Sequence, residues 1–451
     1  MRRLFAAGLV LGSACTAAQK SAPPVEAGEA ADLQAGAKDA FRHAWEGYRR
    51  YAWGHDELKP LGKGPRDWYA EPLLITPVDS LDTMILLGLR DEAERTRAYV
   101  DEHLSFDRDI PVKTFEIVIR VLGGLLSAHQ LTGDPRLLAL ADDLGRRLLP
   151  AFDSPTGMPY VNVNLRTGKA SGAKSNPAEI GTLLLEFGTL SRLTKNEAYY
   201  AKAKNALSQL YSRRSAIGLV GESIDVETGR WLSRESHIGG GIDSYYEYLL
   251  KAWLLFGDED CHRMWLSSIE AVNRTVADEA PSGLWYGSVD METGRRVGTQ
   301  FGALEAFFPA VLVLGGDLGR ARRLQESSFK MWTAARAASD GFDYVEMRPT
   351  QPRWPLRPEI VESAYYLAWA TGERRWTEMG RRFLRDIDAC CRTEAGFTVL
   401  EDVTTGKQGD LMPSYFLAET LKYLWLLGAP QALDPRTSVL NTEAHPLRRT
   451  W

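Results

Sequence analysis

Residues 114–132 read TFEIVIRVLGGLLSAHQLT, an apolar stretch with a carboxylate near its start. The apolar periodicity predicts a helix over about 113–131, and a second helix follows over about 135–149. The first helix is apolar nearly all round, whereas the second is amphipathic and charged. A helix that is hydrophobic on all sides is buried, and an amphipathic helix covers it. The stretch therefore predicts one buried helix packed beneath one surface helix.

The same unit recurs along the whole chain. Seven carboxylate-bearing motifs each open a predicted helix, and a more ordinary helix separates each from the next. The motifs are DSLDT from Asp79, TFEIVIR from Thr114, PAEIG from Pro177, IDSYYEY from Ile242, GALEAFF from Gly302, RPEIVES from Arg357 and SYFLAET from Ser414. The predicted helices span 37–52, 78–88, 91–103, 113–131, 135–149, 177–194, 196–213, 243–256, 258–278, 301–314, 317–336, 357–370, 373–391 and 413–427.

Seven pairs of this kind predict an all-α fold, an (α/α)7 barrel with an inner and an outer ring of helices. Neighbouring inner helices then point the same way, so their N-terminal motifs gather at one end. Loops that begin at Gly157 and Phe397 carry strand and turn signals, which predict short β-hairpins. The tail after Gly428 is Pro-rich and not helical, and it is a candidate to enter or close the toroid.

Composition and the N-terminus narrow the class of protein. The chain has 451 residues, 44% of them hydrophobic, and a formal net charge of -5, which argues against a nucleic-acid partner. Two arginines and the apolar run Leu4–Leu11 predict a signal peptide over 1–18, too short to span a bilayer. Cys15 resembles a bacterial lipoprotein acylation site, so lipidation there and simple cleavage are both open. Residues 19–37 are predicted to be a flexible tether, and 38–451 a single domain.

The spacing of charged residues in the motifs places several of them in pairs on one helix face. Residues three, four or seven positions apart share one face of a helix. Such pairs are Glu116 with Arg120, Asp243 with Glu247, Glu359 with Glu362, and Glu179 with Glu186. Glu419 lies in an otherwise apolar helix. A carboxylate on a buried face is costly unless it is paired or functional, and one alone is usually structural. Several that converge on one pole indicate a site.

Paired carboxylates are the usual machinery of glycoside hydrolysis, one as acid and the other as base or nucleophile. Arg120 and Arg357 are expected to keep neighbouring acids ionised, which would separate the two roles. Competing chemistries have little support, because the sequence contains no HExxH, no GxSxG and no Walker loop. The oxygen-rich pole would instead suit a hard cation such as calcium.

Several long motifs resemble one known family. TFEIVIRVLGGLLSAHQLTGD, GGGIDSYYEYLLKAW, LRPEIVESAYYLAWATG, SYFLAETLKYLWLL and NTEAHPL look like signatures of glycoside hydrolase family 47, the class I α-mannosidases. The resemblance runs from about Ala40 to Pro446 and implies a seven-hairpin α/α barrel and inverting removal of terminal α-1,2-linked mannose. YAWGHDELKPL, ALEAFFPAVLVLGGD and AGFTVLEDVTTG resemble the ER degradation-enhancing branch, but the signal sequence favours a bacterial relative.

The resemblance implies roles for particular residues. Glu116 matches the general acid, which acts through a water, and Glu359 matches the usual candidate for the general base. Asp243 matches a third essential carboxylate, and the choice of base between it and Glu359 stays open. Substrate binding is expected of Arg120, Arg357, Glu362, Tyr415, Glu419, Glu443, Glu179 and Leu304. Thr442 matches the family's direct protein ligand to Ca²⁺. Pro413 and Ala303 depart from the pattern, where the family often has Glu and processing enzymes His.

The sequence therefore predicts a calcium-dependent inverting exo-α-1,2-mannosidase. One alternative is a weakly active or inactive protein that binds mannose glycans on the same scaffold. Another is a sugar epimerase on an α/α barrel, disfavoured because no inner-helix start carries a histidine. The expected partner is a mannose-containing oligosaccharide, with no nucleic acid, no membrane span, an optional lipid anchor at Cys15, and a monomeric state. The expected location is the bacterial periplasm, the outer membrane or the extracellular space.

Overall fold

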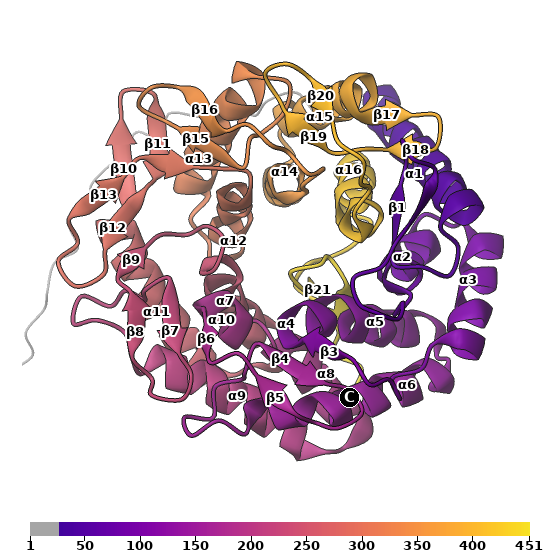
Figure 1. The fold of residues 1–451 in the computed structure, drawn as a ribbon. Coiled ribbons are helices and arrows are strands. Elements are labelled where there is room, and N and C mark those ends of the chain that lie inside the picture. The colour runs from indigo at the N-terminus through magenta and orange to yellow at the C-terminus, as the bar shows by residue number, and fades with distance from the viewer. Residues whose placement is uncertain (1–26) are drawn as a thin grey trace, which may run out of the picture.

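The computed structural model describes residues 27–451, which form a closed ring of paired helices around a central axis (Figure 1). Every predicted helix is present, and the fold is the predicted (α/α)7 barrel. The inner ring contains α2 (Ile75–Leu86), α4 (Thr114–Ile117) with α5 (Gly123–Thr132), α7 (Pro177–Gly181) with α8 (Leu184–Thr194), α10 (Asp243–Phe256), α12 (Phe308–Leu314), α14 (Glu359–Thr371) and α16 (Leu421–Gly428). The outer ring contains α1 (Ala27–Tyr51), α3 (Arg90–His103), α6 (Pro135–Leu148), α9 (Glu197–Tyr211), α11 (Glu259–Thr275), α13 (Leu318–Ala334) and α15 (Arg374–Cys391).

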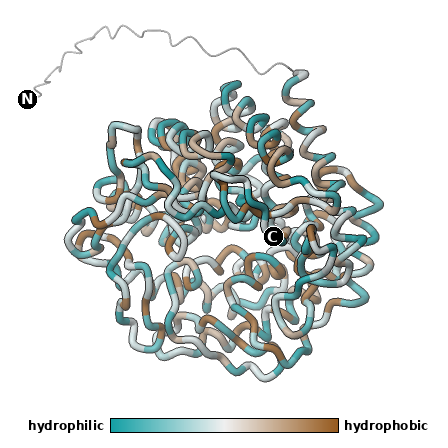
Figure 2. The backbone as a smooth tube through the Cα atoms, turned by 45° about the horizontal axis from the view of Figure 1, so that its top comes forward, coloured by the Kyte–Doolittle hydropathy of each residue, from teal (hydrophilic) through white to brown (hydrophobic). Residues whose placement is uncertain are grey.

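Burial along the helices confirms the alternation that the sequence predicts. In α10, the nine consecutive residues 244–252 are all buried, as expected of a helix enclosed on every side. In α6, only one stripe is buried, and its members are Leu137, Ala141, Leu144, Gly145 and Leu148. Figure 2 shows hydrophobic and hydrophilic residues interspersed along the chain around the ring. No helix within residues 27–451 is both long and apolar enough to cross a membrane.

The first helix closes the ring and corrects one prediction. Residues 27–37, predicted to belong to the tether, are the first turns of α1. Leu33, Ala37 and Phe41 lie four positions apart and are buried, so α1 packs across α16 and α15 as the seventh outer helix. The Ala- and Glu-rich composition, interpreted as a linker, also has high helix propensity, and packing decides between the two. The predicted signal peptide and Cys15 lie outside the described residues, so export and lipidation stay predictions.

The close approach of α1 to the last hairpins depends on Gly47. A Cβ at this position would overlap the backbone carbonyl of Ala395, which cannot move as a flexible side chain would. Gly47→Ala is therefore expected to lower the free energy of unfolding by about 1–3 kcal/mol. The matched control is Gly28→Ala in the same helix, where nothing lies within 4 Å of the new Cβ. Equal stability of the two variants in urea titrations would refute the close contact.

Short antiparallel strands form the loops, including the predicted ones near 157–164 and 396–403. Within the described residues they make nine small sheets, with strand orders β1–β2, β3–β4–β5, β6–β7–β8, β10–β11, β13–β12–β9, β14–β15–β16, β17–β18, β19–β20 and β21–β22. The bounds are β1 Glu57–Lys59, β2 Gly64–Arg66, β3 Pro111–Lys113, β4 Asn162–Asn164, β5 Ala170–Ser171, β6 Lys174–Ser175, β7 Ser223–Asp225, β8 Trp231–Ser233, β9 Glu235–Ser236, β10 Ala277–Ala280, β11 Gly283–Tyr286, β12 Ser288–Asp290, β13 Arg296–Gly298, β14 Gln300–Phe301, β15 Gly341–Asp343, β16 Arg348–Gln351, β17 Arg392–Thr393, β18 Gly396–Phe397, β19 Leu400–Asp402, β20 Lys407–Gln408, β21 Ser438–Leu440 and β22 Pro446–Arg448.

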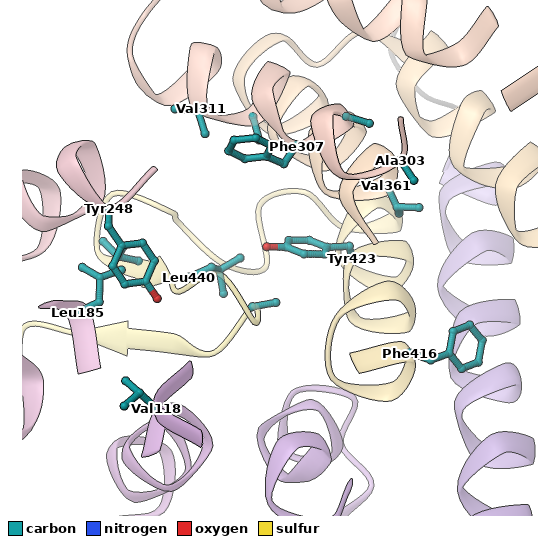
Figure 3. Packing of buried hydrophobic residues seen from close by; sticks show 14 of the residues in the cluster. Val118, Leu185, Tyr248, Ala303, Phe307, Val311, Val361, Phe416, Tyr423 and Leu440 are labelled. Atoms are coloured by element: carbon teal, nitrogen blue, oxygen red, sulfur yellow. The ribbon is translucent and has the colours of Figure 1, made fainter. Parts of the chain in front are cut away.

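The C-terminal tail enters the ring, which settles the expectation left open for it. Strand β21 lies inside the toroid in Figure 1, and Leu440 lies among inner-helix side chains in Figure 3. At the turn between β21 and β22, the Asn441 side chain donates hydrogen bonds to the Ile119 carbonyl (2.9 Å) and to Glu186 (2.7 Å). Lys422 donates to the Ala444 carbonyl at 2.7 Å. The tail therefore plugs the barrel and places residues 441–445 at its centre.

Candidate active site

A cavity of about 280 Å³ opens where the inner helices begin. Its wall contains all twelve residues that the sequence analysis proposed for catalysis, substrate binding and cation binding. These are Glu116, Arg120, Glu179, Asp243, Leu304, Arg357, Glu359, Glu362, Tyr415, Glu419, Thr442 and Glu443. Ten belong to the starts of inner helices or the residues just before them, and the remaining two come from the turn of the C-terminal hairpin. The structure thus brings the candidates together, while their individual roles stay predictions.

Not every motif acid reaches the cavity. Glu186 was predicted to share a face with Glu179, but the helix is interrupted between α7 and α8, so this spacing does not hold. Glu186 instead lies beneath the cavity and accepts a hydrogen bond from the Tyr248 hydroxyl at 2.6 Å. Glu305 caps its own segment by accepting from the Gly302 backbone N–H at 2.8 Å. The two acids of the DSLDT motif are fully buried below the wall.

Two residues of the wall are presented by π-helical turns, which the sequence pattern does not predict. Arg120 lies in the turn Val118–Leu122 and Glu419 in the turn Phe416–Thr420. A π-turn adds one residue to a helical turn and re-aims the side chains there, and such turns are frequent at functional sites. The periodicity of these apolar stretches gives no signal for a single extra residue, because nearly every position is hydrophobic.

Arg120 is the most heavily bonded cation of the wall. Its Nε donates to Glu116 Oε2 at 3.0 Å, and its Nη1 donates to Glu443. The guanidinium carbon also lies 5.4 Å from the ring centroids of Trp68 and Tyr415. Burial alone would lower the pKa of Arg120, but the surrounding carboxylates, Glu443 first, raise it well above its ordinary value. Arg120 is therefore a fixed cation that holds together Glu116, the predicted acid, and Glu443, which is predicted to bind substrate.

Glu247 of the wall is paired with the buried Lys251, whereas Asp243 and Glu359 have no direct ion-pair partner within the described residues. Burial raises the pKa of Asp243 to about 7 and that of Glu359 to about 8. Arg357 was predicted to keep its neighbour ionised, but its Nε donates to Asp340 at 2.7 Å, and burial outweighs its effect on Glu359. Glu359 Oε2 is buried without a hydrogen-bond partner. A half-buried carboxylate with an unbonded oxygen and a pKa near neutrality is the kind of group that general acid–base catalysis uses.

The chemistry of the wall fits a hard cation. Eight carboxyl groups and only two guanidinium groups line the cavity, so its charge is strongly negative when the acids ionise. Residues 27–451 contain no group of three or more His, Cys, Asp or Glu side chains arranged as a metal site. A calcium ion, which takes about 6–8 oxygen ligands, would therefore need Thr442 together with water and ligand oxygens. The wall supplies Thr442 at the hairpin turn, next to Glu443.

Comparison with known proteins identifies the family of this chain. The model of glycosyl hydrolase family 47 matches residues 40–449. Alpha-mannosidase I MNS5 of Arabidopsis thaliana is 38% identical over 440 residues, covering 91% of this chain and 76% of the relative. The human ER degradation-enhancing alpha-mannosidase-like protein 2 is 37% identical over 447 residues, covering 91% and 76%.

The fold comparison gives the same family. The solved structure of an alpha-1,2-mannosidase from Trichoderma reesei superposes with a TM-score of 0.86 at 28% identity, covering 95% of this chain and 100% of that one. The family match over residues 40–449 includes the hairpin that plugs the barrel. The chain belongs to glycosyl hydrolase family 47, the class I α-mannosidases.

Proposed function

We propose that this protein is a calcium-dependent, inverting exo-α-1,2-mannosidase that acts on mannosides or high-mannose glycans. The observation that carries the proposal is the convergence of Glu116, Asp243 and Glu359 on one cavity within a family 47 barrel. The linkage is supported by the similarity to the Trichoderma reesei protein, which is an alpha-1,2-mannosidase.

The plugged barrel supports an exo mode of action. Thr442 and Glu443, at the turn of the inserted hairpin, line the cavity. A glycan cannot thread through a barrel that is filled at its centre, so only a chain end can reach the acids. Terminal mannose units are therefore the expected substrates, and internal linkages of a long mannan should not be hydrolysed.

The acids divide the work of hydrolysis. Glu116 lies against Arg120 and is the proposed acid, which protonates the leaving oxygen through a water. Glu359 and Asp243 are the candidates for the base that takes a proton from the attacking water. Their raised pKa values suit this role, because a general base is most effective near the operating pH. A bound calcium ion, held through Thr442, would supply coordination of sugar hydroxyls and water.

Proton NMR of the product tests the linkage and the stereochemistry together. We expect α-1,2-mannobiose, incubated with the protein and calcium, to release β-mannose first, since attack by an activated water inverts the anomeric centre. The α-1,3, α-1,4 and α-1,6 isomers are the controls and should remain intact. Early α-mannose would refute inversion. Tight binding of the α-1,2 isomer without hydrolysis would favour the alternative of a mannose-binding protein.

The raised pKa values predict how stability depends on pH. Between the ordinary pKa values and those of the folded state, about 7 for Asp243 and about 8 for Glu359, the folded protein holds protons that the unfolded chain has released. Without calcium, the melting temperature should therefore fall as pH rises from about 5 to about 8. Calcium favours the ionised acids, so it should raise the melting temperature more at pH 8 than at pH 5. Scanning calorimetry would contradict this if the calcium-free curve were flat.

A further inference from the structure

His445 lies at the base of the inserted hairpin in an unusual position. It is the one buried histidine of the seven, all of which lie in the described part of the chain. Its Nδ1 lies 2.7 Å from Asp82 Oδ2, and its Nε2 lies 3.1 Å from Asp79 Oδ1. An ionised carboxylate only accepts hydrogen bonds, and a neutral imidazole has only one N–H to donate. Two carboxylate partners therefore require the imidazolium, which carries a proton on both ring nitrogens.

The charges around His445 connect it to the cavity wall. Lys422 lies 2.8 Å from Asp82, whose second oxygen also accepts from the Ser127 hydroxyl. Asp79 is shared, because its Oδ2 lies 4.0 Å from Arg120 Nη1 and has no hydrogen-bond partner. The network thus runs from Lys422 through the two aspartates and His445 to the Arg120 guanidinium, which in turn bonds the acids of the wall.

The electrostatics agree with the geometry. Burial by itself would lower the pKa of His445, but Asp82 and Asp79 raise it to about 9. Glu186 of α8 also interacts electrostatically with the ring, and Lys422 opposes the protonated form. At neutral pH the ring is therefore charged, although its side chain is fully buried.

The barrel leaves room for this ring at the glycine pair of the stretch 114–132. A Cβ on Gly123 would lie 3.0 Å from His445 Cδ2, and one on Gly124 would lie 3.3 Å from His445 Cε1. Both are tighter than ordinary packing, and Asn441 Nδ2 (2.7 Å from a Cβ on Gly123) and the Val78 carbonyl oxygen (2.9 Å from one on Gly124) lie nearer still, so the glycine pair leaves room for the ring together with its neighbours. The two glycines thus avoid a steric clash, and this offsets the stability that glycine costs inside a helix.

His445 belongs to the same tight turn as Thr442 and Glu443, the two residues of the C-terminal hairpin that line the cavity. Asn441 Oδ1 accepts hydrogen bonds from the backbone N–H groups of Glu443 (2.9 Å) and His445 (2.8 Å). Ala444 between them has a φ of 58°, in the left-handed region. A residue fixed at 445 therefore fixes the backbone at 442 and 443, both of which line the cavity.

We propose that His445 is a positioning residue: its imidazolium, held between Asp79 and Asp82, anchors the turn that presents Thr442 and Glu443 to the sugar. Its neutralisation would leave Asp79 with Arg120 as its nearest cation. Arg120 would then move from Glu443 toward Asp79, and Thr442 and Glu443 would no longer be held in one position in the cavity wall. The expected effects on sugar and calcium binding rest on the proposed function, whereas the protonation state of the ring does not.

Histidine-detected NMR of the ¹⁵N-labelled protein tests the protonation state without any assay of activity. We expect two slowly exchanging ring N–H signals from the one buried histidine at neutral pH, both absent in His445→Gln. If that variant does not fold, the slow exchange itself identifies the ring. A single ring N–H signal, which is the neutral form, would overturn the proposal.

Substitution then tests positioning against packing. His445→Gln should raise KM and weaken calcium binding by about 10–100-fold, as loss of an outer-shell partner does, with a smaller change in kcat. Adding Asp79→Asn removes the anion that His445 neutralises, so the double variant should recover much of both losses. His55→Gln, which breaks the partly exposed pair of His55 with Asp67 (2.9 Å), is the matched control and should change neither. Additive damage from Asp79→Asn would show that His445 only fills space.

Discussion

Replacing Glu116 by glutamine is expected to lower kcat by about 10²–10⁴-fold, the usual contribution of one general acid or base. The substitution keeps the size of the side chain and its hydrogen-bonding position beside Arg120, so the barrel should fold as before. Asp243→Asn and Glu359→Gln should cause losses of the same order. Initial rates on α-1,2-mannobiose at saturating calcium measure all three. Near-normal turnover in Glu116→Gln would remove this residue as the acid.

Stability measurements on the same variants separate chemistry from folding. Asp243 and Glu359 are half-buried carboxylates whose charged forms are disfavoured by the loss of water around them. Neutral amides of the same shape remove that cost, so calcium-free Glu359→Gln should melt no lower than the parent protein at pH 8. Glu394→Gln, on the surface beside Lys63, is the control for a glutamate outside the cavity and should leave kcat unchanged. Loss of activity with a lowered melting temperature would instead indicate a structural role.

The architecture could be predicted from the sequence because its signal is repeated. Seven motif-bearing apolar stretches alternate with seven amphipathic ones, and each hairpin must bury the same face, so errors in one helix boundary do not change the fold. The residues of the cavity wall could be predicted for the same reason. Inner helices that point in one direction bring Glu116, Asp243 and Glu359 to one end of the barrel. The specific roles came from resemblance, which local patterns alone could not have assigned.

The rest depends on contacts between distant parts of the chain. The π-turns that aim Arg120 and Glu419 leave no trace in stretches where nearly every residue is apolar. Arg357 bonds to Asp340, which lies in a loop 17 positions before it, and not to Glu359. His445 meets Asp79 across 366 positions, and no local pattern foretells that pair. The start of α1 was misplaced because an Ala- and Glu-rich segment is a linker or a helix according to what it packs against.

Removal of calcium is expected to abolish both hydrolysis and the binding of mannose-like inhibitors. Thr442 alone supplies too few oxygens for an ion that takes about 6–8 ligands, so water and sugar hydroxyls must complete the set. The ion would then belong to the substrate site and would not be a structural clip. Added calcium should restore both properties. Magnesium should restore less, because it holds its water tightly and demands a smaller, octahedral shell.

Substitution of Thr442 tests the same coupling from the protein side. Thr442→Ala removes the hydroxyl, and we expect calcium affinity and mannose affinity to fall together, by at least the roughly 10–100-fold that outer-shell changes cause. Thr442→Ser keeps the hydroxyl and should retain most of both. Thr437→Ala, at an exposed position of the same tail, is the control and should alter neither. Calorimetric titration with calcium, with and without inhibitor, measures the two affinities. Full activity in a verified metal-free sample would show that the acids work without the ion and that Thr442 merely shapes the turn.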